Sequence, residues 1–198
     1  MSSFFYTDVD RGAKHYQIPH SLSLDQTIEI LHNHRLLAEQ IWPLMTVKVV
    51  DSNVAATTVA VESATLKFKA TFTNLDNGVS LQEEIVMGFG VQVQWTVVDR
   101  FSQNVSLLVQ FREEDLRSGA LLEENVRASC LRVVDRFLNF ADEFNPKTKF
   151  LIEFLGKVAS GEISMDDIKI MSRGYGDTER LKRGVIHLDL LGLMFGPS

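Results

Sequence analysis

Short segments in which apolar and polar side chains alternate fill most of the chain between residues 45 and 111. They cover residues 45–49, 54–61, 66–73, 79–87, 91–97 and 105–111. Alternation of this kind places successive side chains on opposite faces of a β-strand. Asn77-Gly78 between two of the segments is typical of a tight hairpin turn, which needs positive φ angles. The pattern predicts a meander of about six or seven antiparallel strands.

A strand and two short helices are expected ahead of this meander. Residues 12–19 form the expected first strand and end in a proline, which cannot donate to a strand ladder. Ser23, with Gln26 three residues later, has the spacing of a capping box and indicates a helix start. Asn33 interrupts the apolar stripe that follows, so a second helix is expected from about residue 34 to 41.

A long amphipathic helix is expected from Ala120 to Phe144, stopped by Asn145-Pro146. Its apolar residues fall in steps of three or four, as in a helix with one buried face. They are Leu122, Val126, Cys130, Val133, Phe137, Phe140 and Phe144. A sheet with one apolar face and one such helix predicts an α+β fold, with the helix laid across a curved sheet.

The chain divides into a first domain, residues 12–146, and a C-terminal extension, residues 147–198. In the extension, a short helix that ends near Gly161 is expected, and Ser164 marks a further helix start. Its last apolar stretch, residues 185–195, is too short to span a membrane. We expect that stretch to pack on its own domain, on a second subunit in a homodimer, or over an opening in the core.

Composition excludes several classes of function. Twenty basic and 26 acidic residues give a net charge of −6, which argues against a nucleic-acid partner. No run of about 18 apolar residues exists to span a membrane. The amino terminus lacks the pattern of a secretory leader, so a cytoplasmic location is expected.

Motifs for metals, cofactors and nucleophiles are missing from the sequence. The single cysteine, Cys130, excludes an internal disulfide and a cysteine-rich metal site. His32 and His34 are two residues apart, which puts them on different sides of a helix. As a metal pair they would need a third ligand, so helix capping or surface exposure is the favoured interpretation. Neither a metal nor a cofactor is expected.

Glu83 is the first of three candidates for chemistry. It has the strand parity of the apolar residues Val79 and Leu81. If its carboxyl points inward, burial raises its pKa and makes it a candidate acid or base. The alternative is a bulge at Glu83-Glu84 that turns both side chains to solvent.

Trp95 and Tyr16 are the other two candidates. Trp95 has the parity of the apolar residue Val93, so its indole either packs in the core or forms the wall of a ligand site. Tyr16 has the parity of Ile18 in the first strand. Its hydroxyl could donate to a ligand carbonyl, or the ring could simply be an aromatic at the sheet edge.

The order of elements resembles the helix-grip fold of the START-like superfamily, which includes birch-pollen allergens and polyketide aromatase/cyclases. Four shorter features look like those of fungal START-like proteins, which points to secondary metabolism: Pro19, Leu31-His32-Asn33-His34, Trp42-Pro43-Leu44, and residues 72–78. The resemblance covers about residues 13–144. It implies a bent sheet and a helix that enclose an apolar cavity for a lipophilic molecule. The expected walls are Phe68, Phe72, Val93, Trp95, Val109, Phe111, Val126, Cys130, Val133 and Phe137.

Such a cavity is compatible with a cyclase that folds a polyketide or terpenoid and promotes ring closure. For an intramolecular Diels–Alder reaction, preorganisation alone can remove roughly 7–11 kcal/mol from the barrier. Tyr16, Trp95 or a protonated Glu83 could add a hydrogen bond to a carbonyl, and Glu83 could instead be the base of an aldol-type cyclase. One alternative is a non-catalytic carrier of a lipid or hydrophobic metabolite. Another is an interaction protein that joins subunits through the apolar tail Leu188–Phe195.

Overall fold

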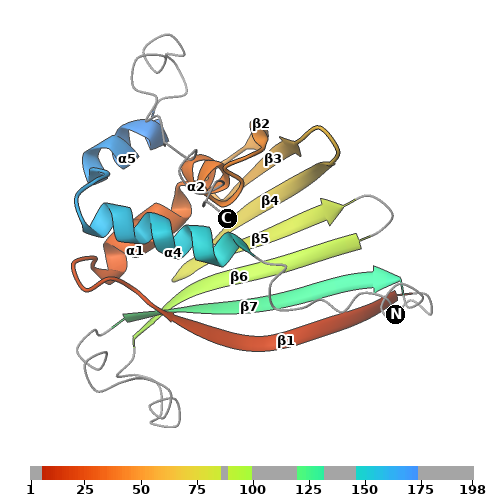
Figure 1. Ribbon diagram of the computed structural model, residues 1–198, viewed down its shortest axis with the longest axis horizontal. Coiled ribbons are helices and arrows are strands. Elements are labelled where there is room, and N and C mark those ends of the chain that lie inside the picture. The colour runs from red at the N-terminus through yellow and green to blue at the C-terminus, as the bar shows by residue number, and fades with distance from the viewer. Residues whose placement is uncertain (1–5, 86–88, 100–119, 132–145, 174–198) are drawn as a thin grey trace, which may run out of the picture.

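The computed structural model describes residues 6–85, 89–99, 120–131 and 146–173. In these residues, seven strands form one antiparallel sheet in the order β1-β7-β6-β5-β4-β3-β2, with the helices on one side of it (Figure 1). The strands are β1 (Tyr6–Gln17), β2 (Thr46–Ser52), β3 (Ala56–Glu62), β4 (Lys67–Leu75), β5 (Gly78–Ile85), β6 (Phe89–Asp99) and β7 (Ala120–Leu131). The helices are α1 (Leu24–His32), α2 (His34–Ile41), α4 (Pro146–Ala159) and α5 (Met165–Arg173).

The junction of α1 and α2 follows the sequence prediction closely. The Ser23 hydroxyl accepts from the Gln26 backbone N–H at 3.1 Å, and the Gln26 side chain accepts from the Ser23 N–H at 2.9 Å. Asn33 ends α1 and caps α2, because its Oδ1 accepts from the Leu36 N–H. Its Nδ2 donates to the Ile168 carbonyl at 3.0 Å and so ties this junction to α5. The two predicted helices are confirmed.

The hairpin of β4 and β5 is also confirmed, with Leu75 paired to Gly78 across the turn. The turn lies one residue earlier than predicted, because its two central residues are Asp76 and Asn77, and Gly78 is the first residue of β5 and has no positive φ. His32 Nε2 lies 3.0 Å from the Leu75 carbonyl oxygen and 2.9 Å from that of Gly78. Both oxygens can only accept, so Nε2 carries the hydrogen and donates to both. His32 thereby anchors the end of α1 on the hairpin.

The inner face of the sheet forms one core with the helices. Its largest fully buried side chains include Phe72, Leu81 and Trp95. The helices add apolar residues to the same core, which are Ile30, Leu31, Leu37, Ile41, Leu151, Leu155 and Ile168. The inward parity predicted for Trp95 and Val93 is therefore confirmed, as both are fully buried.

The prediction of a long helix from residue 120 is wrong for its first part. Residues 120–131 form strand β7, which pairs with β6 on one side and β1 on the other. Leu122 and Val126 are four residues apart, and a step of four is compatible with both helical spacing and strand alternation. Between them lies Glu124, which is 4% exposed and points inward, so the alternation of polar and apolar residues is hidden.

Pro146 was expected to stop a helix, but it is the first residue of α4. Proline suits this position because its missing N–H would lack a helical partner anyway. The expected helix that ends near Gly161 is confirmed as α4, and the start at Ser164 as α5. The predicted strand over residues 105–111, the segment 132–144 and the apolar tail lie outside the described residues.

His34 is buried at the start of α2 and stacks on Phe72, with ring centroids 5.5 Å apart. Its Nδ1 lies 3.0 Å from the Thr57 hydroxyl. Burial, with a smaller contribution from the charge of His32, lowers the pKa of His34 to about 4, although the Asn74 side chain acts in the opposite direction. His34 is thus neutral in the folded protein at pH 7.

The depressed pKa of His34 predicts a loss of stability in mild acid. An unfolded chain binds a proton at His34 near pH 6.5 and the folded chain only near pH 4, so the free energy of unfolding decreases as the pH falls between these values. The full difference is roughly 3 kcal/mol. Urea unfolding at several pH values should give a shallower dependence for His34→Gln than for the control His20→Gln. If the free energy of unfolding depended on pH equally in the two variants, the depressed pKa of His34 would be contradicted.

Replacement by alanine should have opposite effects on stability at two glycines. A Cβ at Gly78 would overlap the Trp95 backbone carbonyl oxygen, so Gly78→Ala should destabilise the protein by about 1–3 kcal/mol. A Cβ at Gly156, inside α4, meets nothing within 4 Å. Gly156→Ala should therefore stabilise the protein by up to about 1 kcal/mol. Thermal unfolding of both variants tests the packing of the hairpin on β6, and an unchanged Tm for Gly78→Ala would refute it.

Candidate functional site

Glu83 points toward the inner face of the sheet and is 3% exposed. It pairs with Ala70 of β4 and Val91 of β6, and neither ladder shifts register at Glu83 or Glu84. The alternative of a bulge that turns both carboxylates to solvent is therefore wrong: Glu84 is exposed and Glu83 is not.

Lys147, near the start of α4, is the charged partner of this buried carboxylate. Its Nζ lies 3.1 Å from Glu83 Oε2, and its side chain is only 13% exposed. The other oxygen, Glu83 Oε1, is buried without a hydrogen-bond partner. Burial raises the pKa of Glu83, and Lys147 acts against that rise through its charge and its hydrogen bond. Glu83 therefore has one oxygen held in place and one buried oxygen without a partner.

A chain of hydrogen bonds lies beside this pair. Trp95 Nε1 donates to the Thr148 hydroxyl at 2.8 Å, and the Thr148 hydroxyl donates to Glu124 Oε1. The Tyr16 hydroxyl donates to the other oxygen of Glu124 at 2.9 Å. The chain joins β6, α4, β7 and β1, and all its members except Tyr16 are almost completely buried.

The amino-terminal turn of α4 brings the pair and the chain together. Lys147 and Thr148 are consecutive, and each reaches a different part of the sheet: Lys147 reaches Glu83 of β5, and Thr148 reaches Trp95 of β6. Glu124, which bonds to the short side chain of Thr148, thus lies near the positive end of the α4 dipole, which favours carboxylates there. We define the candidate site as Glu83, Lys147, Thr148, Glu124, Trp95 and Tyr16.

The structure thus groups the three predicted chemical residues around one helix end, but it gives them different environments. The donors of Tyr16 and Trp95 are both bonded to protein acceptors. Glu83 alone among the three has a buried oxygen without a partner. The available polar group is therefore the carboxyl oxygen of Glu83.

The predicted wall residues are placed in part. Phe68 and Phe72 pack edge-on against Trp42, with ring centroids 5.5 and 5.9 Å away. Val93 of β6 is fully buried. Its partner across the ladder, Val126 of β7, is half-buried. The side chains of Val109, Phe111, Cys130, Val133 and Phe137 lie outside the described residues.

Sequence reasoning missed Lys147, Thr148 and Glu124. The signal for Glu124 is its parity with Leu122 and Val126, which becomes visible only once the segment is known to be a strand. Lys147 and Thr148 follow Pro146, and a proline at the first helical position would have marked them as a helix start. No local pattern indicates which part of the sheet they contact.

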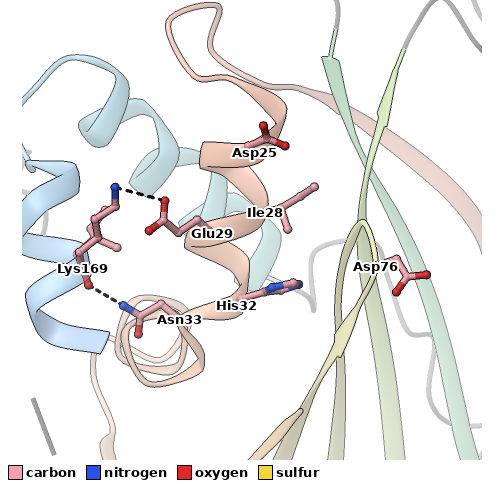
Figure 2. Close-up of a pocket in the computed structure, with 8 residues that line it drawn as sticks. Asp25, Ile28, Glu29, His32, Asn33, Asp76 and Lys169 are labelled. Atoms are coloured by element: carbon pink, nitrogen blue, oxygen red, sulfur yellow. Dashed lines mark hydrogen bonds and ion pairs between the residues drawn. The ribbon is translucent and has the colours of Figure 1, made fainter. Parts of the chain in front are cut away.

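A depression of about 500 Å³ lies between α1, α5 and the turn of the β4–β5 hairpin (Figure 2). Its lining residues are Asp25, Ile28, Glu29, His32, Asn33, Asp76, Ile168 and Lys169. Most of its polar groups already have structural partners: Asn33 bonds to Ile168, His32 to the hairpin and Glu29 to Lys169 at 3.8 Å. Among the described residues, two buried side-chain oxygens lack a hydrogen-bond partner, Glu83 Oε1 and Asn74 Oδ1. Glu83 is the ionisable one of the two, so we place the candidate site there.

Two further findings concern the described ranges. Nowhere in them do three or more His, Cys, Asp or Glu residues gather closely enough to hold a metal ion. None of their helices is both long and apolar enough to cross a membrane.

No protein-family model matches the chain, and no curated protein sequence matches it. A point mutant of norcoclaurine synthase from Thalictrum flavum, in complex with a transition-state analogue, is similar in structure with a TM-score of 0.51 and 11% sequence identity. The match covers 80% of this chain and 99% of that chain. This likeness, together with the sheet and helices above, shows that the chain has the helix-grip fold that the sequence predicts.

Two aromatase/cyclases are more distant matches. The di-domain protein of the steffimycin biosynthetic pathway has a TM-score of 0.44 at 11% identity, covering 91% of this chain and 53% of that chain. The Zhui aromatase/cyclase from Streptomyces sp. R1128 has a TM-score of 0.37 at 14% identity, covering 86% and 98%.

The buried pair predicts a pH-dependent cost of removing Lys147. In Lys147→Met, Glu83 loses its counter-charge, which should destabilise the folded protein by about 3–5 kcal/mol at pH 7. The raised pKa of Glu83 means that the folded state takes up its proton more readily, so this loss should shrink as the pH falls and Glu83 becomes neutral. Chemical denaturation at pH 7 and pH 5 measures the difference.

The control is Lys149→Met on the same helix. The Lys149 side chain is 78% exposed, so its loss should change stability by less than about 0.5 kcal/mol at either pH. If Lys147→Met changed the free energy of unfolding as little as this control does, Lys147 would not stabilise the charged form of Glu83.

Proposed function

We propose that this chain is a biosynthetic cyclase that binds a lipophilic polyketide or terpenoid intermediate on the inner face of the sheet and uses Glu83 in ring formation. The observation that carries the proposal is the Glu83 carboxyl, buried in a largely apolar face with one oxygen bonded to Lys147 and the other without a partner. A buried carboxyl with a raised pKa is suited to proton transfer near neutral pH.

The surroundings of Glu83 support a lipophilic substrate. Across the neighbouring strands its row on the inner face is formed by Ala70, Val91 and Ala128. The adjacent row adds Leu81 and Val93, and none of these side chains offers a polar group. Ala70, Leu81 and Val93 are fully buried in the core, so the proposal requires that the side chains covering this face move apart when substrate binds. A sugar or nucleotide would then find few partners, whereas a hydrocarbon skeleton with one carbonyl would find apolar side chains and one carboxyl.

Two forms of ring closure are compatible with this arrangement. In an aldol-type closure, Glu83 takes the proton from a carbon next to a carbonyl. The electrons of that C–H bond form the new C–C bond to a second carbonyl carbon, whose oxygen becomes protonated. In a Diels–Alder closure, a neutral Glu83 donates a hydrogen bond to the carbonyl that activates the dienophile, while the protein holds both ends of the chain together.

A non-catalytic carrier of a lipid or hydrophobic metabolite is the second candidate function. It is favoured by the donors of Tyr16 and Trp95, both of which are bonded within the protein. A carrier would use the same apolar surface and would not need the free oxygen of Glu83.

We also propose the setting in which this function operates: fungal secondary metabolism in the cytoplasm. Support comes from the motifs that resemble fungal START-like proteins and from a single cysteine, as is usual for proteins of a reducing compartment. The net charge of −6 supports a small-molecule partner over a nucleic acid. Within residues 147–198, α4 and α5 contribute Leu151, Leu155 and Ile168 to the core. The apolar stretch at residues 185–195 stays the proposed lid or contact for a second subunit.

Ring formation from linear polyketide or terpenoid precursors tests the function. The protein should form the cyclic product faster than buffer, and Glu83→Gln should reduce that rate by about 100-fold or more. The matched control is Glu84→Gln, the next residue, whose carboxylate is exposed on the opposite face and should be dispensable. Tight binding of precursors without turnover would favour the carrier and refute the enzyme.

A further inference from the structure

We propose that Thr148 is a positioning residue: its hydroxyl fixes the first turn of α4 on the sheet, so that Lys147 stays in contact with Glu83. This inference rests on the proposed role of Glu83 in ring formation. It gives a role to the chain of hydrogen bonds that joins Trp95, Thr148, Glu124 and Tyr16.

The direction of each hydrogen bond in the chain is determined by its partners. The indole N–H of Trp95 can only donate, so the Thr148 oxygen must accept from it at 2.8 Å. The hydroxyl hydrogen of Thr148 is then available for Glu124 Oε1. A hydroxyl can accept one hydrogen bond and donate another at the same time. Because Thr148 is only 1% exposed, solvent water does not take over either of these bonds.

Glu124 extends the attachment across two more strands. It lies on β7, and its second oxygen accepts from Tyr16 of β1. One hydroxyl on α4 is therefore linked to β6 directly, to β7 directly and to β1 through Glu124. The remainder of α4 contributes Leu151 and Leu155 to the core and packs against α2, so the polar links act on its first turn.

Thr148 acts on Lys147 because the two residues are adjacent. Consecutive side chains of a helix differ by about 100° in direction, so one can reach β5 while the other reaches β6 and β7. The long side chain of lysine has many rotamers, and a fixed backbone limits them to those that reach Glu83. If the first turn of α4 loosened, the 3.1 Å contact between Lys147 and Glu83 would be the first to lengthen.

The substrate-free protein allows a direct test. Replacement of threonine by valine keeps the shape and removes the hydroxyl, whereas serine keeps the hydroxyl. With ¹³C-labelled glutamate carboxyls, NMR titration should show the pKa of Glu83 raised in Thr148→Val by about one unit, because Lys147 opposes the effect of burial less well. Thr148→Ser should restore the parental value.

The matched control is Thr71→Val, on the outer face, where Thr71 bonds only to the Thr58 hydroxyl at 3.1 Å. It should leave the pKa of Glu83 unchanged. Tyr16→Phe removes one bond to Glu124 and should raise the pKa of Glu83 in the same direction by less, which keeps the test decisive if Thr148→Val does not fold. An unchanged pKa in the folded variants would overturn the inference.

The outcome is separable from that of the proposed function. The titration needs no substrate, so a failed positioning role leaves the ring-formation assay and the Glu83→Gln comparison intact. Conversely, a carrier without turnover could still show the pKa shift. In an active cyclase, the rate should fall in Thr148→Val, return in Thr148→Ser and shift its pH profile in step with the pKa of Glu83.

Discussion

A carboxylate in an apolar interior needs a counter-charge, hydrogen-bond donors or a proton, and this constraint governs the arrangement of the protein. The inner face of the sheet carries two such groups, Glu83 and Glu124, each less than 5% exposed. Both are met by the first turn of α4, one through Lys147 and the other through Thr148. The position of this helix end is therefore set by polar contacts with the sheet, while its later turns are held by the core.

The two carboxylates are satisfied to different degrees. Both oxygens of Glu124 accept a hydrogen bond from a protein hydroxyl, which makes it a structural group. Glu83 has one oxygen bonded and one without a partner. A buried ion pair is weak evidence for stability, since apolar residues in its place often stabilise a protein as well or better. The incomplete satisfaction of Glu83 is what we interpret as a sign of function.

Features with a local physical cause could be predicted from the sequence. The capping box of Ser23, the break at Asn33 and the hairpin indicated by Asn77-Gly78 each depend on neighbours within a few residues. The structure confirms the first two and the hairpin, but it centres the turn on Asp76 and Asn77. Strand β7 was predicted as a helix because its apolar residues are four apart and an inward Glu124 hides the alternation. Local propensity could not resolve this, whereas pairing with β1 and β6 does.

The site itself could be predicted only in part. The parities of Glu83 and Trp95 indicated the inner face, but the choice between an inward carboxyl and a bulge required the register of β5 with its neighbours. Lys147 and Thr148 are more than 50 residues from Glu83 and Trp95 in the sequence. Their contacts depend on the placement of α4 over the sheet, which no local pattern contains. Single residues of the site could thus be predicted from the sequence, but the contacts between them could not.

The most direct test of the central claim is whether a lipophilic molecule binds next to Glu83. We suggest following the ¹³C carboxyl signals of the glutamates by NMR while an aryl ketone such as 2-acetylnaphthalene is added to the intact protein. The account predicts a saturable change in the Glu83 signal and none in that of Glu84, which lies on the opposite face. Binding of the ketone with an unchanged Glu83 signal would contradict it.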